Sequence, residues 1–216
     1  LYHDQTFTIG GKTYYANSDG TFATGWVQNG GKTYYFDEDG TSHTGWLILD
    51  GTYYWINANG TRRDDELFQY DGNYYYVDKN GVMATSGWVY WDYNYYYPRS
   101  WGGMYKNAFI TYDNNLYYLG SDSKMAIGWQ SIGGNTYYFR SWGGMYRNTF
   151  FQVGNETYYA GADGKMVTGW LSKDNKWYYF RESGAMYRNT FFTHLNNSYY
   201  ADANGVMVTG ERTING

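Results

Sequence analysis

The side chains best suited to chemistry in this sequence are its aromatic rings. With 10 Trp, 30 Tyr and 11 Phe among 216 residues, aromatic residues make up 24% of the chain. A ring face attracts a quaternary ammonium group by a cation–π interaction of about 0.5–2 kcal/mol, and it also suits the C–H face of a sugar. Five Gly-Trp pairs are therefore candidate ligand sites, although these rings could equally form the core: Trp26, Trp46, Trp88, Trp129 and Trp170.

Two further tryptophans have a different context. Trp101 and Trp142 occur in the repeated stretch Arg-Ser-Trp-Gly-Gly, which begins at Arg99 and again at Arg140. A Trp on a glycine-flanked turn is expected to be exposed, which disfavours a purely structural role. We predict sugar platforms here, with the two arginines donating hydrogen bonds. The alternative is that each Trp packs on the Tyr four residues further along.

Catalysis finds no support in the sequence, and no cofactor or metal is predicted. His3, His43 and His194 lie at unrelated phases of the repeat, and the carboxylates of residues 64–66 have no acid or base partner fixed by the pattern. Residues 37–40 faintly resemble a calcium loop but lack its later ligands, so we expect a plain turn.

Composition narrows the class of protein. The net charge of -4 and the scattered basic residues argue against nucleic-acid binding, and no apolar run of 18 residues could cross a membrane. The absence of Cys excludes disulfides and indicates a bacterial surface rather than an animal extracellular module. Because the chain begins within its own pattern, we expect it to be part of a longer secreted protein; its oligomeric state is not predicted.

The rings recur with a fixed period. The Tyr six residues before the second turn of each repeat follows the previous one by 20 or 21 residues, at Tyr14, Tyr34, Tyr54, Tyr75, Tyr96, Tyr117, Tyr137, Tyr158, Tyr178 and Tyr199. We therefore predict one repeat array over residues 1–216. Two stretches break the pattern, the charged residues 62–66 and the aromatic residues 88–95, and the last repeat ends in Gly210-Glu211 without a Trp.

Each repeat is predicted to be a β-hairpin. In residues 25–40, a strand around Trp26, the turn Asn29-Gly30-Gly31, the strand Lys32–Phe36 and a second turn follow one another. A lone hairpin is marginally stable in water, so the repeats must stack. The predicted fold is an all-β solenoid of about ten stacked hairpins, with a core of Tyr, Trp and Phe rings.

A longer period begins at about residue 82. Gly-Trp repeats alternate with Met-Tyr-[Lys/Arg]-Asn-x-Phe repeats in blocks of about 41 residues, the latter ending at Phe109, Phe150 and Phe191. The Lys/Arg-Asn pairs could bind hydroxyl or phosphate groups of a polymer, or could be polar residues that protect a strand edge.

The motif Gly-Lys-Thr-Tyr-Tyr-Phe, followed by Asp-Gly-x-x-x-Thr-Gly-Trp, resembles the bacterial cell-wall-binding repeats. These include choline-binding repeats of pneumococcal-type surface proteins, glucan-binding repeats of glucansucrases and receptor-binding repeats of large clostridial toxins. The likeness covers essentially the whole chain. It implies a solenoid of hairpins with ligand sites between consecutive units.

In the choline branch, the resemblance implies a site built from the Gly-Trp Trp, an aromatic residue just before the Tyr-Tyr pair, and an aromatic residue and a Met from the following unit. The best candidate comprises Trp170, Trp177, Met186 and Phe191, with Phe191 where the family would have Trp. Thr often precedes the Tyr-Tyr pair in the other repeats, which favours the glucan and toxin branches.

The sequence as a whole predicts a non-catalytic module that targets a secreted bacterial protein to a cell-wall polymer or glucan. One alternative is binding to choline-bearing teichoic acid, and another is a spacer that binds no small ligand. An enzyme would depend on Asp64, Asp65 or Glu66. Many weak aromatic sites would act together through avidity.

Overall fold

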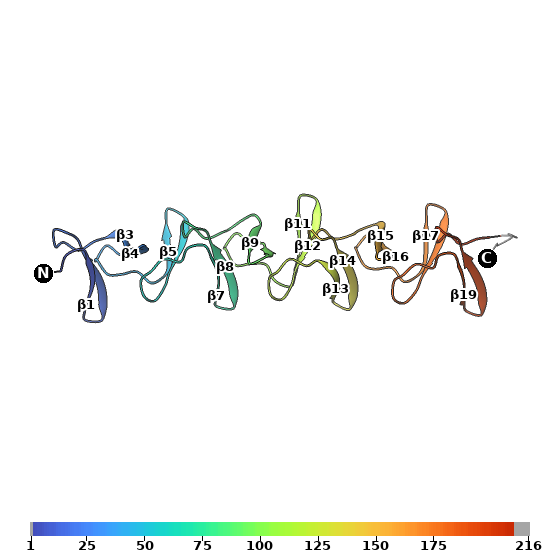
Figure 1. Ribbon diagram of the computed structural model, residues 1–216, viewed down its shortest axis with the longest axis horizontal. Coiled ribbons are helices and arrows are strands. Elements are labelled where there is room, and N and C mark those ends of the chain that lie inside the picture. Colours follow the sequence, from blue (N-terminus) through green and yellow to red (C-terminus); the bar gives the residue numbers. More distant parts are fainter. Residues whose placement is uncertain (1, 210–216) are drawn as a thin grey trace. The chain divides into compact units, whose positions relative to one another are not determined.

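The computed structural model describes residues 2–209, which form ten antiparallel β-hairpins in chain order (Figure 1). Each hairpin is a separate two-stranded sheet. The strands are β1 (Gln5–Ile9), β2 (Lys12–Ala16), β3 (Gly25–Asn29), β4 (Lys32–Phe36), β5 (Gly45–Leu49), β6 (Thr52–Ile56), β7 (Glu66–Tyr70), β8 (Asn73–Val77), β9 (Val89–Trp91), β10 (Asn94–Tyr96), β11 (Ala108–Tyr112), β12 (Asn115–Leu119), β13 (Gly128–Ile132), β14 (Asn135–Phe139), β15 (Thr149–Val153), β16 (Glu156–Ala160), β17 (Gly169–Lys173), β18 (Lys176–Phe180), β19 (Thr190–His194) and β20 (Asn197–Ala201).

The prediction of an all-β array of hairpins is confirmed. The aromatic stretch at residues 88–95 forms a hairpin with strands of only three residues, joined by Asp92 and Tyr93 at φ 45° and 58°. Two consecutive residues with positive φ are typical of the tight turn that matches the twist of a hairpin. No helix within residues 2–209 is long and apolar enough to span a membrane. The Gly210-Glu211 end lies outside the described residues.

Gly-Trp and Asn-x-Phe repeats enter their first strand differently. Both kinds have a residue with positive φ there, but Gly169, at 73°, is the first residue of β17, whereas Asn148, at 47°, lies one residue before β15. Gly adopts this conformation without strain, and Asn and Asp tolerate it better than other side chains. Asn148 also accepts a 2.6 Å hydrogen bond from the Tyr159 hydroxyl, as Asn189 does from Tyr200 at 2.7 Å. The Asn of the repeated motif is therefore structural.

Within each compact unit, a backbone hydrogen bond of one kind joins a repeat to the hairpin before it. The amide of the Met that follows the second turn donates to the carbonyl of the residue preceding the Tyr-Tyr pair of the previous hairpin. The bonds, 2.7–2.9 Å long, include Met83 to Tyr53, Met104 to Tyr74, Met145 to Leu116, Met166 to Thr136, Met186 to Thr157 and Met207 to Trp177, with Arg62 to Thr33 and Ser42 to Thr13 where the Met is replaced.

The core differs from the predicted one of aromatic rings alone. The most deeply buried position is the last residue of each second strand, which is Phe in some hairpins but aliphatic in others, as at Ile56, Val77 and Leu119, each 0% exposed. By contrast, Trp26 and Trp129 are each 39% exposed. The prediction was wrong because the strand end faces the next repeat directly, and either kind of apolar side chain fills that space.

The chain divides into two compact units. One comprises the residues up to Ala108 with Leu119–Lys124, and the other comprises Phe109–Tyr118 with the residues from Met125 onward. In the first unit one cluster gathers Phe68, Tyr75, Val77 and Met83. In the second, a cluster gathers Ala126, Tyr137, Phe139 and Met145. Each cluster combines strand-end residues with a Met, as the repeat pattern requires.

The charged break at residues 62–66 is an ion-paired surface within the first unit. Arg62 contacts Asp64 at 2.6 Å, Arg63 contacts Glu66 at 2.8 Å, and the Tyr76 hydroxyl donates to Asp65 at 2.7 Å. Each carboxylate of residues 64–66 is thus engaged by a neighbouring side chain.

Ser123 gives a first testable prediction. It occupies a second-turn position where other repeats have Gly, with φ of 65°, and its buried hydroxyl makes no hydrogen bond within residues 2–209. Ser123→Gly should raise the free energy of unfolding by about 1–2 kcal/mol, because it removes both the backbone strain and the unsatisfied hydroxyl. Urea denaturation measures this. The reverse change, Gly164→Ser, should destabilise the protein, since φ is 82° there and a Cβ would collide with Met145. Equal stability of Ser123→Gly and wild type would contradict the prediction.

The buried tyrosines predict loss of stability at alkaline pH. Burial raises the pKa of Tyr75, Tyr96, Tyr117 and Tyr178, and burial with the hydrogen bond to Asp65 raises the pKa of Tyr76 to about 12. The unfolded chain then loses these protons first, so the free energy of unfolding should fall as pH rises from about 10 to 12. Urea denaturation at pH 8 and pH 11 tests this. Tyr76→Phe should reduce the difference, and a pH-independent free energy of unfolding would refute the account.

Candidate functional site

Ligand-sized notches lie between consecutive hairpins. Four positions define each notch: the second residue of the first strand, the second residue of the second strand of the same hairpin, the third residue of the second strand of the next hairpin, and the Met after that hairpin. One notch in each compact unit has aromatic residues at all three ring positions. We call them the Trp46 notch (Trp46, Tyr53, Tyr75, Met83) and the Trp170 notch (Trp170, Trp177, Tyr199, Met207).

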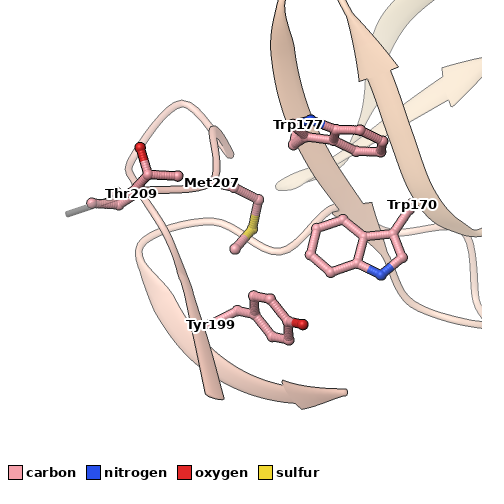
Figure 2. Close-up of a pocket in the computed structure, with 6 residues that line it drawn as sticks. Trp170, Trp177, Tyr199, Met207 and Thr209 are labelled. Atoms are coloured by element: carbon pink, nitrogen blue, oxygen red, sulfur yellow. The ribbon is translucent and has the colours of Figure 1, made fainter. Parts of the chain in front are cut away.

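The Trp170 notch encloses about 370 Å³, and its rings stand as walls (Figure 2). The Trp170 ring meets Trp177 at 84° with centroids 6.1 Å apart, and meets Tyr199 at 71° and 5.0 Å. Trp177 is 53% exposed and therefore forms the outer wall. Steep ring angles leave ring faces turned toward a shared space, as a cation site requires.

Strand pairing and a neighbouring His hold the Trp170 ring. Trp170 lies opposite Tyr179 in the β17–β18 hairpin, with centroids 4.7 Å apart. His194 of the next hairpin contacts the Trp170 ring edge-on at 5.9 Å, and its Nδ1 is 2.8 Å from the Tyr179 hydroxyl. The ring is thus fixed from behind and keeps one face toward the notch.

The Trp46 notch is smaller, at about 230 Å³, and a further ring, that of Trp101, also lines it. Trp46 and Tyr75 meet at 66° with centroids 5.0 Å apart, and Trp101 approaches Tyr75 edge-on at 6.1 Å. Burial raises the pKa of Tyr75, so its phenol stays neutral through the physiological range. Among residues 2–209, no carboxylate lines either the Trp46 or the Trp170 notch.

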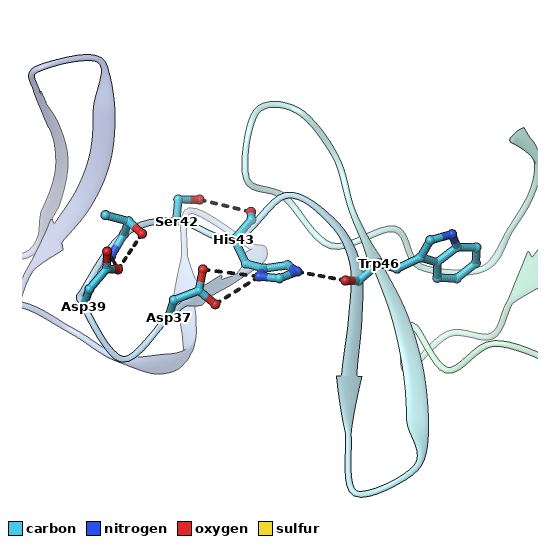
Figure 3. A network of polar contacts seen from close by, with 6 residues as sticks. Asp37, Asp39, Ser42, His43 and Trp46 are labelled. Carbon is cyan, nitrogen blue, oxygen red and sulfur yellow. Dashed lines mark hydrogen bonds and ion pairs between the residues drawn. The ribbon is translucent and has the colours of Figure 1, made fainter. Parts of the chain in front are cut away.

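His43 anchors the strand that carries Trp46 (Figure 3). Its Nδ1 lies 2.9 Å from an Asp37 carboxylate oxygen, and its Nε2 lies 2.9 Å from the Trp46 carbonyl oxygen. Both partners are acceptors, so the ring donates to both when it carries two protons. In the same turn, Asp39 accepts hydrogen bonds from the Thr41 side chain and amide, which lower the pKa of Asp39. These carboxylates therefore shape the turn.

Trp101 and Trp142 are half exposed, at 50% and 48%, as their context predicted. They do not pack on the nearby tyrosines of the alternative interpretation. Instead each ring folds over the Gly two residues later and contacts a Tyr of an earlier hairpin, Tyr75 for Trp101 and Tyr117 for Trp142 at 6.0 Å. Their role in binding a sugar stays a prediction.

The arginines of the same motif stack on those nearby tyrosines. Arg99 lies 4.4 Å from the Tyr105 ring, and Arg140 lies 3.9 Å from the Tyr146 ring. Each also donates Nη1 to the carbonyl of the following Met, at 2.8 Å for Arg99 and 3.0 Å for Arg140. These contacts fix both guanidinium planes and leave other donors of each group available.

Of the four residues predicted to form one site, Trp170, Trp177, Met186 and Phe191, the structure brings only the two Trp together. The two Trp share a notch, but Met186 is 4% exposed in a cluster with Tyr159 and Phe180, and Phe191 is 64% exposed against Tyr200. The reason is register: the hydrogen bond from Met207 to Trp177 brings the Met after the next Tyr-Tyr pair into the notch.

The sequence analysis missed Tyr199 and Met207, as well as Tyr53, Tyr75 and Met83 of the Trp46 notch. The signal for the second notch was present, because Tyr53 is an aromatic residue before the pair Tyr54-Trp55, as Trp177 is before Tyr178-Tyr179.

The other Gly-Trp residues have different surroundings. The Arg62 guanidinium lies 5.2 Å from the centre of the Trp26 ring, where a ligand cation would lie. Trp129 contacts Tyr158 at 4.9 Å, but Thr136 replaces the second aromatic wall. Trp88 meets Tyr95 of its own hairpin at 89° and 6.3 Å.

Comparison with protein families yields two matches. One is the choline-binding repeat, at residues 6–42, 23–62 and 152–191, and the other is the cell wall binding repeat, at residues 65–83, 107–122, 127–145 and 189–207. A comparison with curated protein sequences finds no match.

Similar solved structures come from Streptococcus pneumoniae. Choline binding protein F, determined in the presence of a peptidoglycan analogue, is 30% identical with a TM-score of 0.71, over 92% of this chain and 76% of that one. The choline-binding domain of CbpL is 33% identical with a TM-score of 0.61, over 77% and 87% of the two chains. CbpJ is 26% identical with a TM-score of 0.71, over 94% and 92%.

His43→Ala tests the anchoring of Trp46. Loss of the hydrogen bonds to Asp37 and to the Trp46 carbonyl should lower the free energy of unfolding by about 1–2 kcal/mol and shift the Trp46 indole N–H resonance. Urea denaturation and NMR measure the two effects. His3→Ala is the matched control, since exposed His3 bonds to the Ser18 carbonyl, at 3.0 Å, and its loss should change stability little. An unmoved Trp46 resonance in His43→Ala would contradict the anchoring role.

Proposed function

Because the chain belongs to the choline-binding, cell-wall-binding repeat family of bacterial surfaces, we propose that it binds choline groups of a cell-wall polymer in the Trp46 and Trp170 notches. In this role it is a non-catalytic module that holds its protein on the wall. The choline alternative of the sequence analysis is thus better supported than binding to a glucan.

The observation that carries the proposal is the pair of notches that each combine three aromatic rings and a Met, with no carboxylate among residues 2–209 in their lining. A quaternary ammonium cannot donate a hydrogen bond, so it needs no acceptor and gains from ring faces and the soft thioether. A primary ammonium would lose hydration here without a hydrogen-bonding partner. The lining therefore favours choline over lysine-like cations.

The Trp170 notch also has few groups that could recognise a sugar. Its lining residues besides the rings and Met207 are Val208 and Thr209. A sugar site needs several hydrogen-bonding groups around its stacking ring, since each hydroxyl that loses water must find a partner. This is the physical reason for preferring choline at this position.

Two weak sites on one chain suit attachment to a polymer. Each of the two notches is expected to bind choline with a Kd in the millimolar range, which corresponds to a binding free energy of about 4 kcal/mol. A polymer that presents many choline groups would engage both, and linked sites raise apparent affinity by about 10²–10⁴.

Removing the exposed aromatic ring of each notch tests the proposed choline binding. Trp177→Ala and Tyr53→Ala should each weaken choline binding at one site by roughly 2–30-fold, because one ring face is lost. Isothermal titration with choline chloride measures this, and the double variant should elute earlier from choline resin. Both side chains are exposed, 53% and 38%, so the fold should persist.

Phe191→Ala is the matched control, since this ring is 64% exposed but lies outside the notch. It should bind choline as wild type does. Retention of wild type on dextran but not on choline resin would refute the proposal in favour of a glucan. Retention on neither matrix nor on purified cell walls would indicate a spacer.

A further inference from the structure

A third notch, in the second compact unit, has a different lining from the Trp46 and Trp170 notches. It encloses about 380 Å³, and its polar lining residues are Asn114, Asn115, Arg140, Arg147 and Asn148. Its lining, as far as residues 2–209 form it, contains two guanidinium groups and no carboxylate, although the chain as a whole has 20 acidic and 16 basic residues. We call it the Arg147 notch.

Neither arginine of the Arg147 notch pairs with an acid within residues 2–209. Other arginines of the chain do, such as Arg62 with Asp64 and Arg181 with Glu156. Two uncompensated positive charges in one notch produce a local positive potential, which attracts an anion.

The backbone holds both guanidinium groups in place. Arg147 Nε donates to the Ala162 carbonyl at 3.1 Å, which leaves its terminal nitrogens directed away from that bond. Arg140 is fixed by its bond to the Met145 carbonyl and by stacking on Tyr146. A guanidinium presents parallel N–H donors that match the oxygens of a phosphate group. The neighbouring Asn side chains supply further amide donors.

From this arrangement we infer that the Arg147 notch is a binding site for a phosphate group, free or in a phosphate ester. This inference does not depend on the proposed choline binding: the Arg147 notch could bind phosphate even if the Trp46 and Trp170 notches bound no choline. Alongside them, it would let one chain bind both the cationic and the anionic groups of a polymer.

The next block of the array provides an internal comparison. Residues 41 positions further on repeat this notch, with Arg181 and Arg188 for the two arginines but Glu156 in place of Asn115. Glu156 accepts a 3.2 Å hydrogen bond from Arg181, and Arg188 donates to the Thr157 hydroxyl at 3.2 Å. The chain thus supplies its own anion there, and this second notch needs no external one.

The test is an NMR titration of the full chain with inorganic phosphate at constant ionic strength, following arginine Nε–H and backbone amide resonances. Wild type should show saturable shifts around Arg140, Arg147 and Asn148. Arg147→Gln should weaken binding at least 10-fold, and Asn115→Glu should abolish it by installing the internal carboxylate. Glu156→Asn should create a second set of saturable shifts around Arg181 and Arg188.

Lys12→Gln is the control for net charge. Lys12 is an exposed basic residue that forms an ion pair with Asp39, and both residues belong to the first compact unit rather than to the unit of the Arg147 notch. This variant should bind phosphate as wild type does. Shifts that do not saturate, or equal weakening by Lys12→Gln and Arg147→Gln, would overturn the site. Titration of each variant with choline keeps the two proposals separate, since Trp177→Ala should affect choline alone and Arg147→Gln phosphate alone.

Dimethyl phosphate forms a second arm of the titration. Binding at least as tight as that of inorganic phosphate would identify a polymer phosphodiester as the source, whereas binding of inorganic phosphate alone would identify a free or terminal phosphate. Both results support the site, and failure of both anions to bind refutes it.

Discussion

One backbone hydrogen bond between repeats sets the geometry on which every notch depends. The amide of the Met after the second turn can reach the carbonyl before the previous Tyr-Tyr pair only if the two hairpins stack in a single register. That bond places the Met side chain, the next Tyr and the preceding strand around one space. The second-turn Gly is part of the same constraint, since at Gly164 and Gly205 a Cβ would collide with the Met of the previous repeat. A notch is thus a consequence of stacking rather than an addition to it.

Because the same backbone hydrogen bond recurs between repeats within each compact unit, the chemistry of a notch is decided by few side chains. Three rings and a Met give an open cage at Trp46 and at Trp170. Arg62 in place of the Met puts the chain's own cation over Trp26. Leu116 in place of an aromatic wall, with Arg147 nearby, gives a cationic notch. Cation–π attraction and ion pairing are comparable in strength at exposed sites, so one substitution is enough to change which charge a notch accepts.

The period of the rings was enough to predict the hairpins and their turns, and the resemblance to cell-wall-binding repeats implied that Trp170 and Trp177 share one site. It did not predict which Met completes that notch. Met186 and Met207 are equivalent in the repeat, and only the hydrogen bond to the Trp177 carbonyl distinguishes them. The Arg147 notch was still less accessible from sequence, since its residues come from three separate turns between Asn114 and Ala162. The Asn of Met-Tyr-[Lys/Arg]-Asn was ambiguous for another reason: its role lies in a positive φ and a hydrogen bond to a Tyr hydroxyl, neither of which composition reveals.

The difference between the expected and observed cores explains how the tryptophans can be available to a ligand. If the rings alone formed the core, turning a Trp toward solvent would cost the burial of a large apolar surface. Here the strand-end residues and the Met residues provide the deepest burial, with Phe36, Ile56, Leu119 and Met104 each at most 1% exposed. The Gly-Trp rings need only one buried face, and strand pairing with a Tyr such as Tyr179 supplies it. Their other face then contributes little to folding, which leaves it available for the choline contact proposed above.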